Sequence, residues 1–333
     1  MKRKFVVLLA VFILVLCHPA AYAAFGPVEQ QIMDPLPDPP SGSQVSPVSH
    51  DDTAGGNAVE SIIQWGNQVI NIFGFRNHPA GDVMDEAMMT DECKAVIDLL
   101  GCDYELYLYD GNVGALLARF TDLTIQGKAA GFYPLIVIPS DILVEKLNWE
   151  FTRGGVENTA DGIAAYREKV IDMAQGIDAE AFLLARLDYY MERFEGYDIL
   201  GEFMPLLSNG RTSLYLDLIG LSQEVIIAKV PAENPWELAA WIPMGGYNAC
   251  PAPEEQVAVF RYWYKNYGAV PAFVTYDIWQ MTVVNPPLTD EAAEALAMEQ
   301  FAFCEDVVFQ GADTIRLLAS FLKNASSWFF WWD

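Results

Sequence analysis

The chain has 333 residues, of which 19 are basic and 45 acidic, so its formal net charge is −26. This excess argues against nucleic acid and anionic membranes as partners, because binding to either depends on lysine and arginine that neutralise phosphates. With 53% hydrophobic residues the chain has ample core material. Its length allows one large domain or two smaller ones.

The N-terminus reads as a secretory signal peptide over 1–23. Basic residues at 2–4 precede an apolar run over 5–16, and Ala21 and Ala23 supply the small residues that signal peptidase recognises. We therefore expect cleavage after Ala23 and a secreted or cell-envelope protein. Cys17 leaves an alternative, a lipoprotein anchored at that cysteine. No other run is apolar enough to predict a transmembrane span.

Residues 24–56 are rich in proline, serine and aspartate and hold few large apolar residues, which predicts a disordered spacer. The rest divides into an N-terminal α/β region over 57–207 and a C-terminal domain over 208–333, with the turn at 208–210 as the boundary. Strands and helices alternate unevenly along both parts. The expected fold class is α+β, with a mixed sheet packed against helices.

Apolar periodicity predicts the individual elements. Helices are expected over 57–74, 91–100, 113–126, 141–149, 159–174, 178–194, 253–267, 289–309 and 314–322, with a further helix starting at Asn234-Pro235. Strands are expected over 104–109, 133–138, 212–216, 224–230, 270–276, 278–284 and 328–332. The last strand, Trp-rich and apolar on both faces, is predicted to be buried at the centre of the sheet.

The stretch 241–251 has the composition of an ordered loop, with two prolines, a Gly-Gly pair, an asparagine, a cysteine and two aromatic residues. It is also part of a longer pattern. That pattern comprises residues 234–237, 240–251, 263–271, 277, 285–287, 299–300, 304–306, 310–311 and 328–333. From about residue 231 onward the chain thereby resembles a bacterial family known as domain of unknown function 4253, with Tyr247 where tryptophan is more often expected. The resemblance does not point to a particular activity or to particular catalytic residues.

Catalytic signatures are scarce. Of the three histidines, only His78 lies in the part expected to fold, which argues against His-based triads and multi-His zinc sites. The remaining acid–base candidates are three carboxylates, Asp277, Glu299 and Asp306, which could form a cluster for glycoside hydrolysis or metal binding. The favoured alternative is structural: Glu299 bonds loop amides, and the two aspartates are turn and surface residues.

The same region supplies a candidate binding set. Its members are Trp241, Gly245, Gly246, Tyr247, Asn248 and Trp263. Tryptophans here could line a sugar or peptide groove, or simply form a large-residue core.

Four cysteines remain after the signal peptide: Cys93, Cys102, Cys250 and Cys304. Cys93 and Cys102 flank a predicted helix of nine-residue span, roughly 13 Å long, which is too far for a bridge. Cys250 and Cys304 are the better pair for a disulfide or thiol contact. Four buried free thiols are the alternative.

The sequence therefore favours an exported acidic protein that acts as a non-catalytic binding module for a peptide, a glycan or a cationic protein. The alternative is a carboxylate-dependent hydrolase that uses Asp277, Glu299 and Asp306 on a glycan or peptide. No cofactor and no metal are expected in either case.

Overall fold

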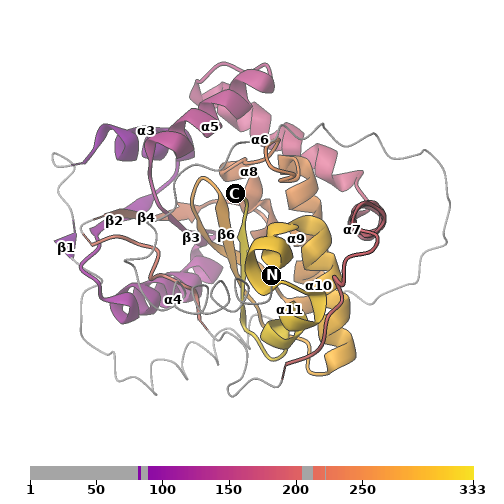
Figure 1. Ribbon diagram of the computed structural model, residues 1–333. Helices are drawn as coiled ribbons and strands as arrows, with labels where there is room; N and C mark the ends of the chain where they lie inside the picture. Colours follow the sequence, from indigo (N-terminus) through magenta and orange to yellow (C-terminus); the bar gives the residue numbers. More distant parts are fainter. Residues whose placement is uncertain (1–81, 84–88, 205–212, 222) are drawn as a thin grey trace.

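The computed structural model describes residues 82–83, 89–204, 213–221 and 223–333 (Figure 1). Several predictions fall outside these ranges: the signal peptide over 1–23, the spacer over 24–56, the helix over 57–74, His78, and the turn at 208–210. Among the described residues, no helix combines the length and the apolar composition that a membrane span requires.

The strands of the described part form one mixed sheet in the order β1-β2-β4-β3-β5-β6-β7. They are β1 (Asp82–Val83), β2 (Tyr104–Leu108), β3 (Tyr133–Val137), β4 (Glu224–Val230), β5 (Val270–Val274), β6 (Ile278–Thr282) and β7 (Ser327–Trp331). Neighbouring strands are antiparallel except β3 and β5, which are parallel. The predicted α+β class and mixed sheet are confirmed.

Helices surround this sheet. They are α3 (Asp91–Leu100), α4 (Val113–Ala130), α5 (Asp141–Arg153), α6 (Ala160–Gln175), α7 (Ala179–Arg193), the 3₁₀ turn η3 (Pro235–Glu237), α8 (Leu238–Trp241), α9 (Pro253–Tyr267), α10 (Asp290–Phe303), the π-helix η4 (Val307–Ala312) and α11 (Ile315–Leu322). Figure 1 shows α4 at one side of the sheet, well apart from α9, α10 and α11.

Two hydrophobic cores lie on the two faces of the sheet. Strand β3 takes part in both, because Leu135 and Val137 belong to the larger core and Ile136 to the smaller core under α4. All three side chains are fully buried, as the continuous apolar run predicts. Strand β3 lies between β4 and β5, so the regions on either side of residue 208 share one sheet.

Capping residues mark the boundaries of several predicted helices. Ser140 and Asp178 accept hydrogen bonds from the backbone N–H groups three residues on, at the starts of α5 and α7. Gly101 and Gly268 end α3 and α9 in the left-handed conformation, which glycine adopts without steric cost. The sequence therefore indicates these boundaries correctly.

Three predicted elements differ. Residues 213–216 form no strand, because the Gln280 side chain pairs with the backbone N–H and C=O of Tyr215 at 2.6 and 2.8 Å in place of a neighbouring strand. The helix expected over 289–309 ends at Phe303, where Cys304 is extended, and the π-helix follows.

Strand β7 is at the edge of the sheet, not at its centre as predicted. Both of its faces are apolar, and each face packs against a different hydrophobic core. Trp328 and Phe330 are fully buried in the larger core, whereas Phe329 and Trp331 pack, partly buried, against the smaller one. Apolar residues on both faces therefore indicate packing on both sides, and do not require a partner strand along each edge.

A cluster of aromatic rings joins β7 to α9 and α10. Trp263 of α9 is fully buried and stacks on Phe330 with ring centroids 5.3 Å apart and an interplanar angle of 8°. Edge-to-face contacts link the same indole to Trp328 at 5.5 Å and to Phe303 at 5.0 Å. These rings make up the Trp-rich core at the C-terminal end of the chain.

Candidate functional site

The loop 241–251 has an unusual backbone. Gly245 has φ +141° and Gly246 has φ +71°, and Asn248 and Ala249 follow with φ +42° and +56°. Glycine adopts such angles without steric cost, so the backbone strain falls on Asn248 and Ala249 and must be offset by the surrounding structure. A Cβ atom on Gly245 would lie 2.2 Å from the carbonyl oxygen of Pro251, so only glycine fits there.

Buried side chains from two helices fix this backbone. The Nε2 atom of Gln256, on α9, donates to the carbonyl oxygens of Met244 at 2.6 Å and Pro251 at 2.8 Å. Arg186, on α7, donates from Nη2 to the carbonyl oxygen of Ala249 at 2.7 Å and from Nε to that of Ala302 at 2.6 Å. Hydrogen bonds from buried side chains therefore fix the loop on both sides of its exposed residues, Gly246 and Asn248.

Tyr247 connects the loop to the β5–β6 turn. Its hydroxyl donates to the carbonyl oxygen of Tyr276 at 2.8 Å. Lys146, on α5, places Nζ 3.1 Å from the centroid of the Tyr247 ring and 5.2 Å from that of Tyr276, a cation–π arrangement. Burial lowers the pKa of Lys146, and the charge of Asp277 opposes that shift.

The exposed rim of the loop meets a tryptophan that sequence reasoning missed. Gly246 and Asn248 are exposed, and a Cβ atom on Gly246 would lie 3.5 Å from the Trp149 ring. Trp149 is 51% exposed, and the Arg153 guanidinium lies 5.3 Å from its centroid. We define the loop face as Lys146, Trp149, Arg153, Gly246, Tyr247 and Asn248.

A signal for Trp149 exists in the sequence. The buried stripe of α5 runs through Leu143, Leu147 and Phe151 at four-residue spacing, which places position 149 on the other side of the helix. A tryptophan off the buried stripe is a candidate surface contact. The loop beside it comes from a distant part of the chain, and its position cannot be read from this spacing.

The remaining predicted binding residues lie elsewhere. Trp241 is partly buried and stacks under Arg167, whose Cζ atom is 4.8 Å from the indole centroid. Arg167 also donates to the carbonyl oxygens of Leu99 and Leu100 at 2.7 and 3.1 Å, which ties α6 to the end of α3. Trp263 is fully buried, so its side chain lies in the core and does not reach a ligand at the surface.

The three predicted carboxylates have separate partners. Asp277 accepts from the hydroxyl of Thr275 at 2.7 Å and from the indole N–H of Trp331 at 3.0 Å. It therefore holds the end of β7 to the β5–β6 turn. Burial raises its pKa, and these hydrogen bonds oppose the shift.

Glu299 accepts from the hydroxyl of Tyr262 at 3.0 Å and from the indole N–H of Trp263 at 2.9 Å, and not from loop amides as expected. Asp306 accepts from the Gln310 side chain at 3.0 Å and the Asp333 backbone N–H at 3.2 Å. Each carboxylate thus fastens a different helix or chain end. In the described part of the chain, no three His, Cys, Asp or Glu side chains are grouped as a metal ion would require.

The cysteines of the described part are free thiols, so Cys250 and Cys304 form no disulfide. The Cys304 thiol donates to the carbonyl oxygen of Trp331 at 3.1 Å, and Gln256 Nε2 approaches the Cys250 sulfur at 3.6 Å. Burial raises the pKa of both thiols well above the usual value, which keeps them protonated and unreactive.

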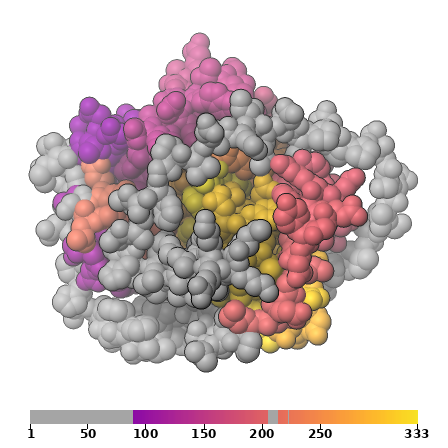
Figure 2. All heavy atoms as spheres, in the orientation of Figure 1, coloured from indigo at the N-terminus to yellow at the C-terminus, as the bar shows by residue number. Residues whose placement is uncertain are grey.

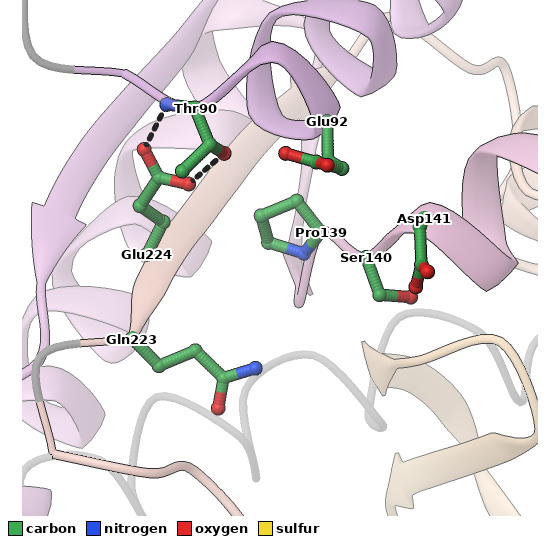
Figure 3. A pocket seen from close by; sticks show the side chains of 7 residues that line it. All are labelled: Thr90, Glu92, Pro139, Ser140, Asp141, Gln223 and Glu224. Carbon is green, nitrogen blue, oxygen red and sulfur yellow. Dashed lines mark hydrogen bonds between the residues drawn. The ribbon is translucent and has the colours of Figure 1, made fainter.

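A separate pocket of about 290 Å³ opens where α3 and α5 begin. Its lining residues are Thr90, Glu92, Pro139, Ser140, Asp141, Gln223 and Glu224 (Figure 3). The Glu224 carboxylate accepts from both the backbone N–H and the hydroxyl of Thr90, and Ser140 caps α5. These groups accept hydrogen bonds at the N-termini of α3 and α5. The sequence analysis singles out none of these residues as a functional site.

Comparison with known proteins identifies the C-terminal part of the chain. Residues 226–333 match a family model described as Domain of unknown function (DUF4253). The DUF4253 region begins inside β4 and includes the loop 241–251, Gln256, the three carboxylates and Cys304. Lys146, Trp149, Arg153 and Arg186 precede it. No curated protein and no solved structure matches the chain.

Burial of acids in the DUF4253 region predicts a pH dependence. Burial raises the pKa of five carboxyl groups there: Glu255, Asp277, Glu299, Glu305 and Asp306. Above the ordinary value of 4.5 for glutamate, the folded protein then binds more protons than the unfolded chain. The free energy of unfolding, measured by urea unfolding at several pH values, should therefore fall as the pH rises above the ordinary glutamate value of 4.5.

Two variants test the cause. Glu299→Gln should reduce that slope, because it removes one of the five groups. Glu105→Gln should leave the slope unchanged. Hydrogen bonds from Arg119 lower the Glu105 pKa to about 2, so the stability that this carboxylate contributes is lost only below about pH 4.5. Stability that rises towards pH 8 would contradict the prediction.

Proposed function

We propose that this protein is a non-catalytic binding module, and that it binds a peptide or glycan at the loop face. The observation that carries the proposal is the position of Trp149, half exposed beside Gly246. Burial of a large aromatic ring is favourable, so exposing it to water is costly. Monomeric proteins rarely expose large contiguous apolar patches unless these patches bind a partner or ligand.

The composition of the loop face supports the proposal. Tryptophan, tyrosine and arginine are the residue types that contribute most free energy to binding interfaces, and Trp149, Tyr247 and Arg153 lie together here. Asn248 adds an exposed amide for hydrogen bonds. The Gln256 and Arg186 hydrogen bonds hold the loop in one conformation, so that little conformational entropy is lost when a ligand binds.

A hydrolase is less well supported. Asp277, Glu299 and Asp306 each accept hydrogen bonds from their own donors, and these donors belong to different elements. Glycoside hydrolysis needs two carboxyl groups on either side of one bond. Trp263, which donates to Glu299, is fully buried, so that carboxylate is committed to the core.

We further propose that binding takes place outside the cytoplasm, after removal of residues 1–23. The basic residues at 2–4 and the apolar run over 5–16 support export. Cleavage after Ala23 would release the protein, whereas lipid attachment at Cys17 would keep it at the envelope. The net charge of −26 suits a protein that stays soluble there.

The test is a panel of glycans and peptides screened against the purified protein and its Trp149→Ala variant. We expect at least one ligand class to bind, with a dissociation constant at least tenfold weaker for the variant, about 1.4 kcal/mol. Separate glycan and peptide arms decide which class binds.

The matched control is Met173→Ala, which removes another exposed apolar side chain from α6 and should leave binding unchanged. Circular dichroism checks that both variants are folded. A ligand bound equally well by wild type and Trp149→Ala would place the site elsewhere, and turnover of any panel member would contradict a non-catalytic role.

A further inference from the structure

A second exposed aromatic surface lies where α7 ends. Phe194, at the C-cap of α7, contacts Phe309 of the π-helix with centroids 4.4 Å apart and Tyr197 with centroids 6.1 Å apart. Tyr197 is 74% exposed and Phe309 is 37% exposed. We call Phe194, Tyr197 and Phe309 the aromatic patch. In Figure 2 the segment near residue 200, in red-pink, lies at the surface beside the yellow C-terminal residues.

The aromatic patch is anchored in the core. Phe309 meets the buried Phe301 edge to face at 5.4 Å, and Phe301 in turn contacts Tyr190 at 5.4 Å. Phe309 lies in the π-helix, which ends with an i to i−5 hydrogen bond from the N–H of Asp313 to the carbonyl oxygen of Val308 at 2.8 Å. Such helices are rare and occur frequently at functional sites.

Acidic residues surround this patch. Exposed carboxylates lie along the chain beside Phe194 and Tyr197, and others flank the π-helix. The exposed ones are Glu192, Glu195, Asp198 and Asp313, whereas Glu305 is buried and Asp306 partly buried. Arg193 lies over the Phe194 ring. Burial raises the pKa of Glu305, and the charge of Arg193 opposes that shift. An apolar centre with a negative rim is complementary to a partner whose apolar residues are flanked by positive charges.

We propose that the aromatic patch is the docking surface for a basic amphipathic segment of a partner protein, with apolar side chains over Tyr197 and Phe309 and lysine or arginine facing the rim. The overall charge of −26 would steer such a segment from a distance. The patch then supplies the short-range apolar contact that charge alone lacks. This surface is distinct from the loop face and does not depend on it.

The test measures binding of a model helical peptide, with leucine along one face and lysine along the other, to the full protein by calorimetry or fluorescence anisotropy. An oligolysine of equal charge serves as the comparison. We expect the amphipathic peptide to bind at least tenfold more tightly than oligolysine. Tyr197→Ala with Phe309→Ala should abolish that difference, whereas Trp149→Ala, which removes an exposed ring from the loop face, should leave it intact.

The double alanine variant removes the contact between Phe309 and the core, so a second variant is needed. Glu192→Lys with Glu195→Lys changes only exposed side chains and should weaken peptide binding at least tenfold. Equal binding of oligolysine and the amphipathic peptide would overturn the proposal, as would an unchanged affinity of both variants. A concentration-dependent dimer that disappears in Tyr197→Ala would assign the patch to a second copy of this chain and also overturn it.

Discussion

Trp263→Ala is expected to lower the free energy of unfolding by about 3–5 kcal/mol, the usual cost of removing a large aromatic side chain from a core. The indole is fully buried and contacts Phe303, Trp328 and Phe330. The truncation leaves a cavity at the junction of α9, α10 and β7. It also removes the 2.9 Å donor to Glu299. Urea unfolding followed by tryptophan fluorescence measures the change.

Two variants separate these contributions. Trp263→Phe keeps most of the ring contacts and loses the indole N–H, so its expected cost is about 1–3 kcal/mol, that of a buried acceptor left without its donor. Trp149→Ala removes an exposed indole and should cost about 0.5 kcal/mol or less. If Trp263→Ala is no more costly than Trp149→Ala, the aromatic cluster does not stabilise the fold as described.

Gly245→Ala should destabilise the protein by more than about 3 kcal/mol, because a positive φ costs a residue with a Cβ about 1–3 kcal/mol and the clash adds to that. The new methyl would meet the Pro251 carbonyl oxygen, which Gln256 holds in place. The backbone cannot relax without breaking that hydrogen bond. Thermal unfolding measures the loss, and ligand binding at the loop face should fall in parallel.

Gly246→Ala is the matched control at the adjacent position. Its φ of +71° carries a strain of roughly 1–2 kcal/mol for an L-residue, but its Cβ atom would make an ordinary contact with Trp149 at 3.5 Å. The Gly246 variant should therefore stay folded at temperatures where the Gly245 variant does not. Equal stability of the two variants would show that the backbone at Gly245 can move away from Pro251.

Local patterns in the sequence predict most of the elements. The apolar run over 133–138 gives a strand buried on both faces, and glycine at 101 and 268 marks two helix ends. These features depend on neighbouring residues alone. The errors arise where distant residues intervene. The Gln280 side chain, on β6, hydrogen-bonds the backbone of Tyr215. Strand β7 is packed on both faces, although among the described strands only β6 pairs with it.

The candidate site is predictable only in part. The glycines and prolines of residues 241–251 correctly indicate an ordered loop whose backbone requires glycine. Which side chains surround it is set by the packing of α5 and α7 against the DUF4253 region, and no local spacing reveals that Lys146, Trp149 and Arg186 meet the loop. Trp263 shows the converse error. It is predicted to bind a ligand because it is close to the loop in sequence, but it lies on the inner face of α9 and is fully buried.

The position of β4 between β2 and β3 has a consequence for biosynthesis. Both neighbours pair with β4 and not with each other, yet β3 ends at Val137 and β4 starts only at Glu224. A nascent chain that emerges from the N-terminal end must therefore carry two apolar strands with unpaired edges until β4 is made. Exposed edges of this kind promote association between chains. Association between chains is therefore favoured during this interval, whatever the stability of the finished fold.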